Sequence, residues 1–522
     1  MAEYLRPGVF IEEIERGPRP IEGVPTSTAA FLGQTERGPT RPRLVTSYGD
    51  YQRWFGGVFA SDRYMPYAAA GFFENGGKRL FVCRIVTEDA RPATAGFGEF
   101  TVDAAGPGIW GNNIWVSIEE SSTKAVPKDS QEGTEPRPVG FRLRAAYWST
   151  TPPGFQVFDP KAEPKRFPRP AVIEDFDDLV IDEASPDFFE KRLNGNSALI
   201  RMSRPPGSTS LPDQTAQQLA DGSDGTTALG VDDFAGVPNA SRTEAQGLEA
   251  LETDPFRDVS LVYAPFHPSL ENNILAQKVI SHCERLKFRF AVVDTESRQS
   301  SIADIDPRTT ITDTQFAATY YPWIQISDPQ TGVLRLVPPG GHALGVYART
   351  DTERGVFKAP ANEIARGVVD LEYDITDGQQ EQLNPRGVNV IRRFPGRGIR
   401  VWGARTLSSN GLWKYVSVRR LFIFLERSIY ENTQWVVFEP NDDRLWARVK
   451  DTLRLFLRSQ WRNGALFGRT EEEAFFITCD RTTMTQDDIL NGRLICEIGI
   501  APVRPAEFVV FRVFQHTAEA QR

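Results

Sequence analysis

The sequence predicts a multidomain protein of mixed α/β and α+β class. Its 522 residues exceed what a single hydrophobic core usually holds, which indicates more than one domain. A strand–helix–strand pattern over 258–294 is typical of βαβ units in a parallel sheet. Two amphipathic helical patterns over 418–462 add a helical C-terminal part. The composition fits this class, since hydrophobic residues make up 40% and charged residues 25% of the chain.

The first part of the chain predicts an arm followed by a compact α/β region. Residues 1–25 hold a short apolar run at 9–14 between prolines, and an isolated strand of this kind needs a sheet to join. Beyond the arm, residues 28–33 and 78–86 are predicted as buried strands, and Ser47 is the expected N-cap of a short helix between them.

The middle of the chain predicts an insertion and then a return to α/β structure. Residues 91–255 are rich in loops and proline clusters, and 174–258 carries 18 acidic residues against 6 basic ones. This favours a solvated, loop- and β-rich insertion over an acidic binding site. Strands at 258–264 and 288–294 then flank a helix over 272–286, which predicts parallel strands.

Two helices and two strands are predicted at the C-terminal end. The first helix has a stripe from Val418 to Ile429, and the second, over 442–462, begins at two aspartates and ends at Asn463-Gly464. Strands are expected at 493–500 and 507–516. The last of these is apolar on both faces, so we expect it to be paired and buried on both sides.

A basic belt covers residues 392–469, where 16 Lys and Arg stand against 6 Asp and Glu. Five of the ten tryptophans lie in it, at 402, 413, 435, 446 and 461. Cations interleaved with aromatic platforms would suit a single-stranded nucleic-acid groove. Arg and Trp are equally typical of protein interfaces, and the net charge of −9 argues against a general nucleic-acid coat. We favour a protein interface and predict no direct nucleic-acid contact.

No catalytic, cofactor or metal motif is recognisable in the sequence. The segment from Gly71 to Lys78 fails as a phosphate loop, because Gly77 lies between its second glycine and Lys78, and Arg79 stands where a serine or threonine is needed. The four cysteines are isolated among apolar neighbours, which indicates buried thiols rather than a metal site or disulfide framework. His342, in a Gly-rich stretch, is interpreted as a turn histidine. We also expect no signal peptide and no membrane span, and therefore synthesis in the bacterial cytoplasm.

Several segments, in order, resemble the contractile tail sheath proteins of phages and of bacterial contractile injection systems. They begin with Arg6-Pro-Gly-Val-Phe-Ile-Glu-Glu13 and Gly23-Val-Pro-Thr-Ser-Thr-Ala-Ala-Phe-Leu-Gly33. They continue with Val337-Pro-Pro-Gly-Gly341, then Gly398-Ile-Arg-Val-Trp-Gly-Ala-Arg-Thr-Leu407 and Tyr415-Val-Ser-Val-Arg-Arg420. The insertion has no counterpart in this resemblance.

The resemblance implies a non-enzymatic subunit that polymerises helically around an inner tube. Its extended state would be metastable, and contraction would drive the tube through a target envelope. It implies partners of the same chain, the inner tube, and baseplate and terminal cap proteins, within a phage tail or a tail-like particle that can be released from the cell. The middle domain would be similar in fold to subtilisin-like proteases, yet 256–385 lacks their nucleophile turn. An α/β hydrolase with unrecognised catalytic residues is the alternative.

The resemblance also implies roles for particular residues. N- and C-terminal arms would add strands to a neighbour's C-terminal sheet. The strand-exchange residues are Val9, Phe10, Ile11, Ile14, Phe508, Val510, Phe511, Val513 and Phe514, with hinges at Pro18, Pro20, Pro25, Pro502 and Pro505. A short helix over 485–490 would contact the inner tube through Asp487 and Asp488, although an ordinary capped surface turn explains these residues as well.

These readings divide the chain into six parts. They are the N-terminal exchange arm (1–25), the N-terminal part of the core (26–90), the variable acidic insertion (91–255), the subtilisin-like α/β domain (256–385), the C-terminal core domain (386–504) and the C-terminal exchange arm (505–522).

Overall fold

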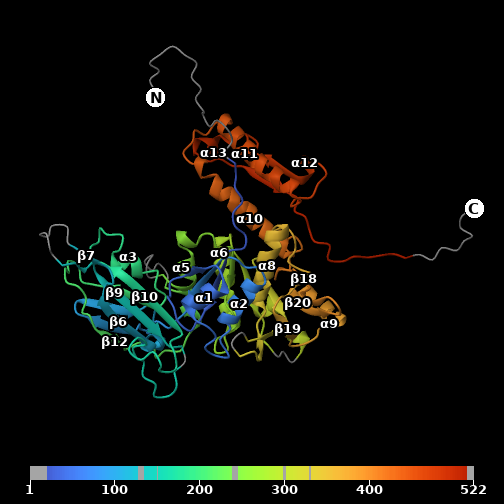
Figure 1. Ribbon diagram of the computed structural model, residues 1–522. Helices are drawn as coiled ribbons and strands as arrows, with labels where there is room; N and C mark the ends of the chain where they lie inside the picture. Colours follow the sequence, from blue (N-terminus) through green and yellow to red (C-terminus); the bar gives the residue numbers. More distant parts are fainter. Residues whose placement is uncertain are drawn as a thin grey trace, which may run out of the picture. The chain divides into compact units, whose positions relative to one another are not determined.

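The structure is a computed structural model that describes residues 20–126, 135–149, 151–237, 245–297, 301–328 and 331–513 (Figure 1). The chain divides into two compact units. The core unit holds residues 25–420, and the C-terminal unit combines the chain up to Val24 with the chain from Leu421. The division falls within a single helix, α10 (Val416–Asn432).

A nine-stranded sheet forms the centre of the core unit. Its order is β18-β21-β20-β15-β14-β13-β1-β3-β2. The strands are β1 (Ala29–Gly33), β2 (Arg43–Val45), β3 (Leu80–Arg84), β13 (Leu261–Tyr263), β14 (Phe290–Asp294), β15 (Ala317–Tyr321), β18 (Glu363–Ile364), β20 (Val388–Phe394) and β21 (Gly398–Val401). Pairing is parallel from β3 through β20 and antiparallel at both edges. The mixed α/β class and the parallel sheet are confirmed, and the sheet joins strands from both sides of the insertion.

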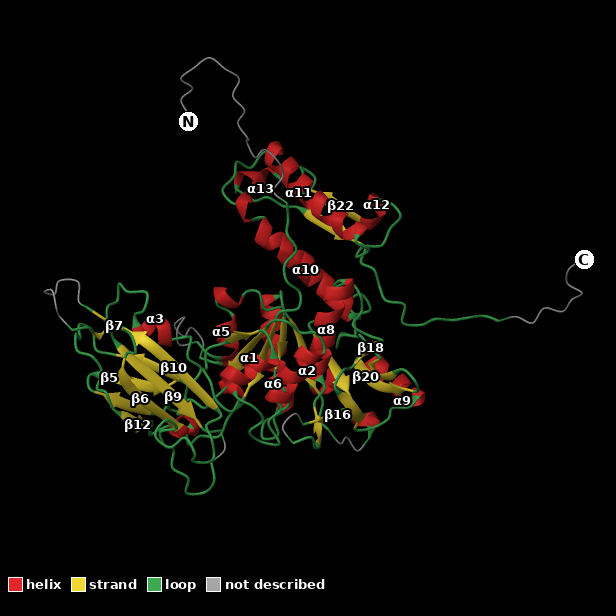
Figure 2. Ribbon diagram, viewed as in Figure 1, coloured by secondary structure: helices red, strands yellow, loops and turns green. Residues whose placement is uncertain are grey.

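Helices flank this sheet (Figure 2), and a glycine allows one pair of them, α2 and α8, to pack unusually close together. The helices of the core unit are α1 (Tyr48–Phe55), α2 (Met65–Glu74), α4 (Val231–Ala235), α5 (Gly247–Leu251), α6 (Asn272–Leu286), α7 (Pro307–Thr310), α8 (Gly340–Arg354) and α9 (Asp377–Leu383). A Cβ on Gly341 of α8 would lie 2.5 Å from the Cα of Ala68 in α2. Only glycine therefore permits this contact.

The close packing of α8 corrects the interpretation of His342. This residue belongs to the first turn of α8 and is buried, so it is not a turn histidine. The glycines before it allow α8 to approach α2 and Tyr263 rather than forming a loop. Burial lowers the pKa of His342 to about 4, so the imidazole is neutral at physiological pH.

A smaller antiparallel sheet joins β16 (Ile324–Ser327), β17 (Leu334–Val337) and β19 (Val368–Leu371).

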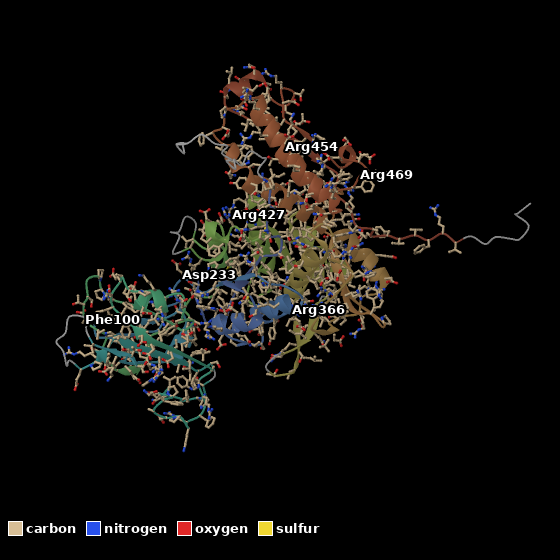
Figure 3. The ribbon with its side chains drawn as sticks, turned by 45° about the horizontal axis from the view of Figure 1, so that its top comes forward. Phe100, Asp233, Arg366, Arg427, Arg454 and Arg469 are labelled. Atoms are coloured by element: carbon tan, nitrogen blue, oxygen red, sulfur yellow. The ribbon has the colours of Figure 1, made fainter. Side chains whose placement is uncertain are left out.

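The insertion is a β-rich subdomain, as predicted. Its main sheet has the order β10-β9-β6-β12, and a second has the order β11-β5-β4. The elements are β4 (Thr94–Phe97), β5 (Phe100–Ala104), β6 (Ile114–Glu120), β7 (Lys124–Ala125), β8 (Arg137–Pro138), β9 (Phe141–Tyr147), β10 (Val172–Leu179), α3 (Phe189–Leu193), β11 (Ile200–Ser203) and β12 (Ala216–Gln218). Both sheets contribute to one apolar core that contains Phe100 (Figure 3). The Phe100 ring makes edge contacts with Phe141 and Phe189.

The C-terminal unit is built from helices over a two-stranded sheet. Its elements after α10 are α11 (Asp443–Arg462), α12 (Glu471–Ala474), β22 (Phe475–Thr478), α13 (Gln486–Leu490) and β23 (Glu497–Ile500). The predicted second helix is confirmed, with Asp442 as its N-cap and a buried stripe that runs from Trp446 to Leu457. The strand expected over 493–500 is shorter than predicted. Its partner β22 follows three glutamates and was not anticipated from its Phe-Phe-Ile-Thr sequence.

Candidate assembly interface

The sheet of β22 and β23 in the C-terminal unit has two open edges. The strands pair antiparallel, from Phe475 opposite Ile500 to Thr478 opposite Glu497. Among the described residues neither strand has a second partner strand. Each therefore presents backbone N–H and C=O groups at its outer edge, which is the chemistry needed to add a strand from another chain.

One face of this sheet packs on the unit and the other faces outward. Phe475 is buried with the apolar stripe of α11, whereas Phe476 on the opposite face is 59% exposed. The Phe476 ring lies directly over Gly499 on β23, where any Cβ would clash with it. The sheet therefore has a firm support on one side and an accessible aromatic surface on the other.

The chain after β23 is anchored for three residues and then leaves the unit. Ala501 N donates to Ala474 O at 2.9 Å, Phe467 N donates to Ala501 O at 2.8 Å, and Val503 N donates to Ala465 O at 3.2 Å. Pro502 lies inside this anchored stretch, in a bridge with Leu466. Pro505 lies beyond the last of these hydrogen bonds.

The segment 504–513 differs from the buried strand expected at 507–516. Its described residues form no strand, and their apolar side chains are between 68% and 93% exposed: Phe508, Val509, Val510, Phe511 and Val513. Phe514 lies outside the described residues. The physical reason is that no strand of the described chain lies beside this segment to complete its hydrogen bonds.

The root of the N-terminal arm is fixed along α10. Val24 N donates to Ser428 Oγ at 3.2 Å, and Glu22 exchanges hydrogen bonds with the Asn432 side chain at 3.3 and 3.1 Å. Pro20 and Pro25 are exposed on either side of this contact. The other arm residues singled out from the sequence, Val9, Phe10, Ile11, Ile14 and Pro18, lie outside the described residues.

The two aspartates proposed for tube contact, which are neighbours in α13, have different surroundings. Asp488 forms a capping box with Thr485: its Oδ2 accepts from Thr485 N at 3.0 Å and from Thr485 Oγ1 at 2.6 Å. These hydrogen bonds hold the pKa of Asp488 below its usual value. The Asp487 side chain is exposed and has no hydrogen-bond or ion-pair partner in the described structure. Asp488 thus shapes the helix, and Asp487 is the carboxylate that is available to a partner.

The tryptophans of the basic belt form no exposed stacking surface. None of the five is classed as exposed, and Trp446 is fully packed in the α11 stripe. Two arginines of α11, Arg454 and Arg458, pair with Glu471 at 3.4 and 2.6 Å (Figure 3). The cations of this helix are therefore engaged in part within the chain, which does not suit a nucleic-acid groove.

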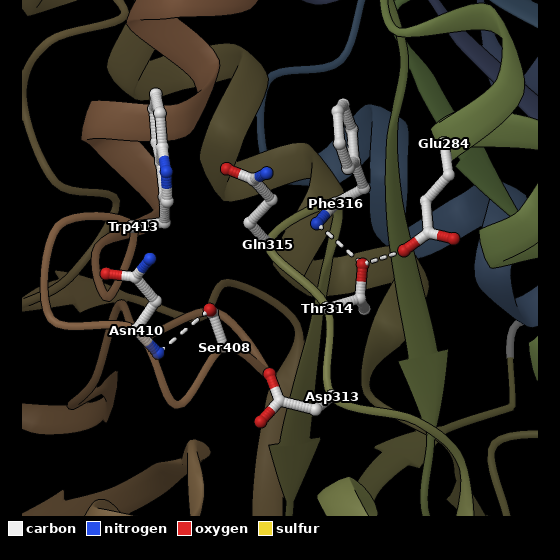
Figure 4. A pocket seen from close by; sticks show the side chains of 8 residues that line it. All are labelled: Glu284, Asp313, Thr314, Gln315, Phe316, Ser408, Asn410 and Trp413. Atoms are coloured by element: carbon white, nitrogen blue, oxygen red, sulfur yellow. Dashed lines mark hydrogen bonds between the residues drawn. The ribbon is translucent and has the colours of Figure 1, made fainter.

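A polar pocket of about 320 Å³ in the core unit bears on the hydrolase alternative (Figure 4). Its lining residues hydrogen bond to one another: Thr314 Oγ1 donates to the Glu284 carboxylate, and the backbone N–H of Asn410 donates to Ser408 Oγ at 3.1 Å. No histidine or cysteine is among the eight lining residues. The pocket thus lacks a hydroxyl or thiol paired with a histidine base.

The described parts of the chain offer neither a metal site nor a membrane span. These parts contain no group of three His, Cys, Asp or Glu side chains arranged to hold a metal ion. They also contain no helix with the length and hydropathy needed to cross a bilayer. The open-edged sheet and the exposed apolar segment are therefore the candidate site in the described chain.

Comparison with known proteins identifies the family. Residues 239–407 match the model of the phage tail sheath protein central domain, and 408–516 match that of the phage tail sheath C-terminal domain. The chain is 28% identical over 198 residues to a prophage major tail sheath protein of Pseudomonas aeruginosa, a match that covers 37% of this chain and 49% of that one. It is 23% identical over 282 residues to the tail sheath protein of Salmonella phage ViI, covering 52% and 43%. The chain belongs to the phage tail sheath protein family.

Solved structures share this fold across nearly the whole chain. The sheath of an extracellular contractile injection system, PVC, in its contracted state superposes with a TM-score of 0.59 at 22% identity, covering 99% of this chain and 100% of that one. The sheath tail protein of Listeria innocua gives 0.55 at 12% identity, covering 92% and 96%. The aligned stretches span about half or less of the curated relatives' own length.

Proposed function

We propose that this protein is the structural subunit of a contractile sheath. It polymerises helically around an inner tube in a metastable extended state and contracts to drive the tube through a target envelope. The observation that carries this proposal is that one small unit contains both a two-stranded sheet with open edges and an exposed apolar segment, 508–513. The family membership supports it, and nothing in the comparisons supports a hydrolase.

Strand exchange supplies the contacts between subunits in this proposal. The segment 508–513 of one subunit adds to an open edge of β22 or β23 in another, and residues 9–14 add to the remaining edge. Each addition satisfies backbone groups that are unpaired in the single chain and covers exposed Phe and Val side chains. Pro505 serves as the C-terminal hinge, because it follows the last anchoring hydrogen bond at Val503.

The remaining assignments complete the proposal. Asp487 on α13 faces the inner tube, and baseplate and terminal cap proteins close the ends of the polymer. The division into an arm, a core with an insertion, a C-terminal domain and a second arm is retained. The central part is taken to be subtilisin-like in fold and without catalysis, which is supported by its parallel strands β13, β14 and β15.

A single substitution in the exposed segment tests strand exchange. Val510→Pro removes a backbone donor and restricts φ, so it blocks pairing at that position without touching the folded units. The matched control is Val510→Thr, which keeps the donor and a branched side chain.

Negative-stain microscopy of the purified proteins gives the readout. We expect hollow striated cylinders from the natural chain and from Val510→Thr, and dispersed particles from Val510→Pro with unchanged circular dichroism. Cylinders of normal length from Val510→Pro would show that this segment is not the connecting strand. Dispersed particles from all three proteins at every concentration would overturn the sheath function.

A further inference from the structure

Two of the four free cysteines face each other across the two-stranded sheet. The ladder ends with Thr478 opposite Glu497, and one step further it places Cys479 opposite Cys496. Directly opposed residues of an antiparallel pair have Cβ atoms about 4.5–5.5 Å apart and lie on the same face. The two thiols are also close enough to shift each other's pKa. The sequence interpretation, four isolated buried thiols, missed this pairing because 16 residues separate the two positions.

We propose that Cys479 and Cys496 form an oxidisable pair whose disulfide closes the loop that carries α13. A disulfide requires Cα atoms about 4.4–6.8 Å apart, a range that includes the usual spacing of cross-strand neighbours. The two remaining cysteines, Cys83 and Cys283, are buried in the core unit and have no such cross-strand partner in the described register.

The reaction needs a two-electron oxidant, and a hydroperoxide is the class that we assign. Cys496 is the more accessible thiol, because Cys479 is fully buried and Cys496 only partly so. The Cys496 sulfur takes one oxygen from the peroxide, the O–O bond breaks, and the Cys496 sulfenic acid forms as the peroxide is reduced to an alcohol or water. The Cys479 sulfur then attacks Cys496, the S–S bond forms, and the hydroxyl leaves as water with the Cys479 proton.

The environment of the pair makes this reaction slow. Burial raises the pKa of both thiols, that of Cys496 to about 12, so little thiolate is present at neutral pH. The pair therefore remains reduced in a reducing cytoplasm and responds to prolonged exposure to an oxidant. The pair therefore acts as a slowly forming cross-link and not as a rapid sensor of oxidants.

Closing this pair constrains the helix proposed to contact the tube. The intervening residues, 480–495, contain α13 and Asp487. A cross-link at the base of this loop reduces the number of conformations that it can reach before binding. This consequence rests on the proposed function, whereas the cross-link itself does not.

Peptide mapping of the folded full-length protein tests the cross-link. The protein is incubated with hydrogen peroxide, alkylated and digested with trypsin without reduction. We expect the peptide with Cys479, residues 470–481, to be joined to the peptide with Cys496, which begins at Leu494. Cys496→Ala should lose this species, and Cys283→Ala should retain it. Recovery of both peptides unjoined from the oxidised natural protein would overturn the proposal.

A second measurement tests whether the disulfide orders the loop that carries α13. Hydrogen–deuterium exchange over 480–495 should slow several-fold on oxidation of the natural protein and stay unchanged in Cys496→Ala. Unchanged exchange in a fully cross-linked sample would show that the bridge does not order α13. Absence of cylinders from both the reduced and the oxidised protein would instead count against the sheath function and leave the cross-link result standing.

Discussion

Single residues join two distant parts of the core unit at one buried point. Arg420 donates to Asp351 of α8 at 3.0 Å, and each side chain is 3% exposed. Arg420 also donates to Thr26 O at 2.9 Å, while Thr26 Oγ1 donates to Asp351 at 2.7 Å. Thr26 and Arg420, at the two ends of the core unit, are therefore tied to the same carboxylate.

Removal of one member of this buried ion pair should be costly. Asp351→Asn leaves the Arg420 charge buried with only neutral partners, so we expect a loss of about 3–5 kcal/mol in the free energy of unfolding. Urea denaturation followed by tryptophan fluorescence measures it. The exposed pair of Arg166 and Glu163 is the control, where Glu163→Gln should change stability by less than about 1 kcal/mol. Equal losses in both variants would show that burial does not set the cost.

Asp294 predicts a dependence of stability on pH. Burial raises its pKa to about 7 although Tyr263 Oη–H and Phe266 N–H donate to its Oδ2, and its Oδ1 has no partner among the described residues. The folded state then holds a proton that the unfolded chain releases above about pH 4. The stabilisation that comes from protonated Asp294 is fully present below about pH 4. As the pH rises towards 7 it is lost, and the free energy of unfolding falls by up to ~1.4 kcal/mol for each pH unit.

Denaturation at several pH values between 5 and 8 isolates this group. The free energy of unfolding of Asp294→Asn should fall less steeply over this range than that of the natural protein. Parallel curves for the two proteins would assign the dependence to other groups.

Among the elements, α11 shows how far local sequence signals reach. Its start at the two aspartates, its stripe and its end were predicted, because they depend on residues within or next to the helix, whereas the role of Asp442 as N-cap was not. The strand β22 was missed, because a strand of four residues is defined by its partner β23, about twenty positions away. The strand at 507–516 was predicted from its apolar character, but this character only shows that the segment needs a partner and not where that partner lies.

The N-cap of α11 should carry a measurable share of stability. Asp442 Oδ1 accepts from Leu445 N at 2.9 Å, so Asp442→Ala leaves a backbone donor without its partner. We expect a loss of about 1 kcal/mol, measured by thermal or urea unfolding. Asp443→Ala is the matched control, because the Asp443 carboxylate lies in the first turn of the same helix but does not make the capping hydrogen bond. A larger effect from Asp443→Ala would contradict the assignment.

At the scale of the whole molecule, the general class was predictable and the assembly surface only partly so. The family resemblance named both arms, but not the anchoring of residues 20–24 along α10 or the open edges of a two-stranded sheet. The anchoring depends on contacts between segments about 400 positions apart, and the sheet on strands about twenty positions apart, so no local pattern encodes either.

The tube contact can now be tested with one residue instead of two. Asp487→Lys reverses an exposed charge and keeps the Thr485–Asp488 capping box. We expect weaker co-assembly with the inner tube protein, measured by sedimentation of the mixed components, and unchanged tube-free polymers. Glu472→Lys, an exposed acidic residue in α12, is the control. Equal loss of both kinds of polymer in Asp487→Lys would reject the role in tube binding.

The two open edges of the β22–β23 sheet have a consequence for load sharing. Under the proposed exchange, each subunit receives two strands and donates two, so it is a node with four links. A network of such nodes remains continuous when any one link breaks, whereas a chain with two links per node separates at the first failure. Tension applied at one end of the cylinder then divides among many parallel paths, and no single strand pairing sets the force at which the wall fails.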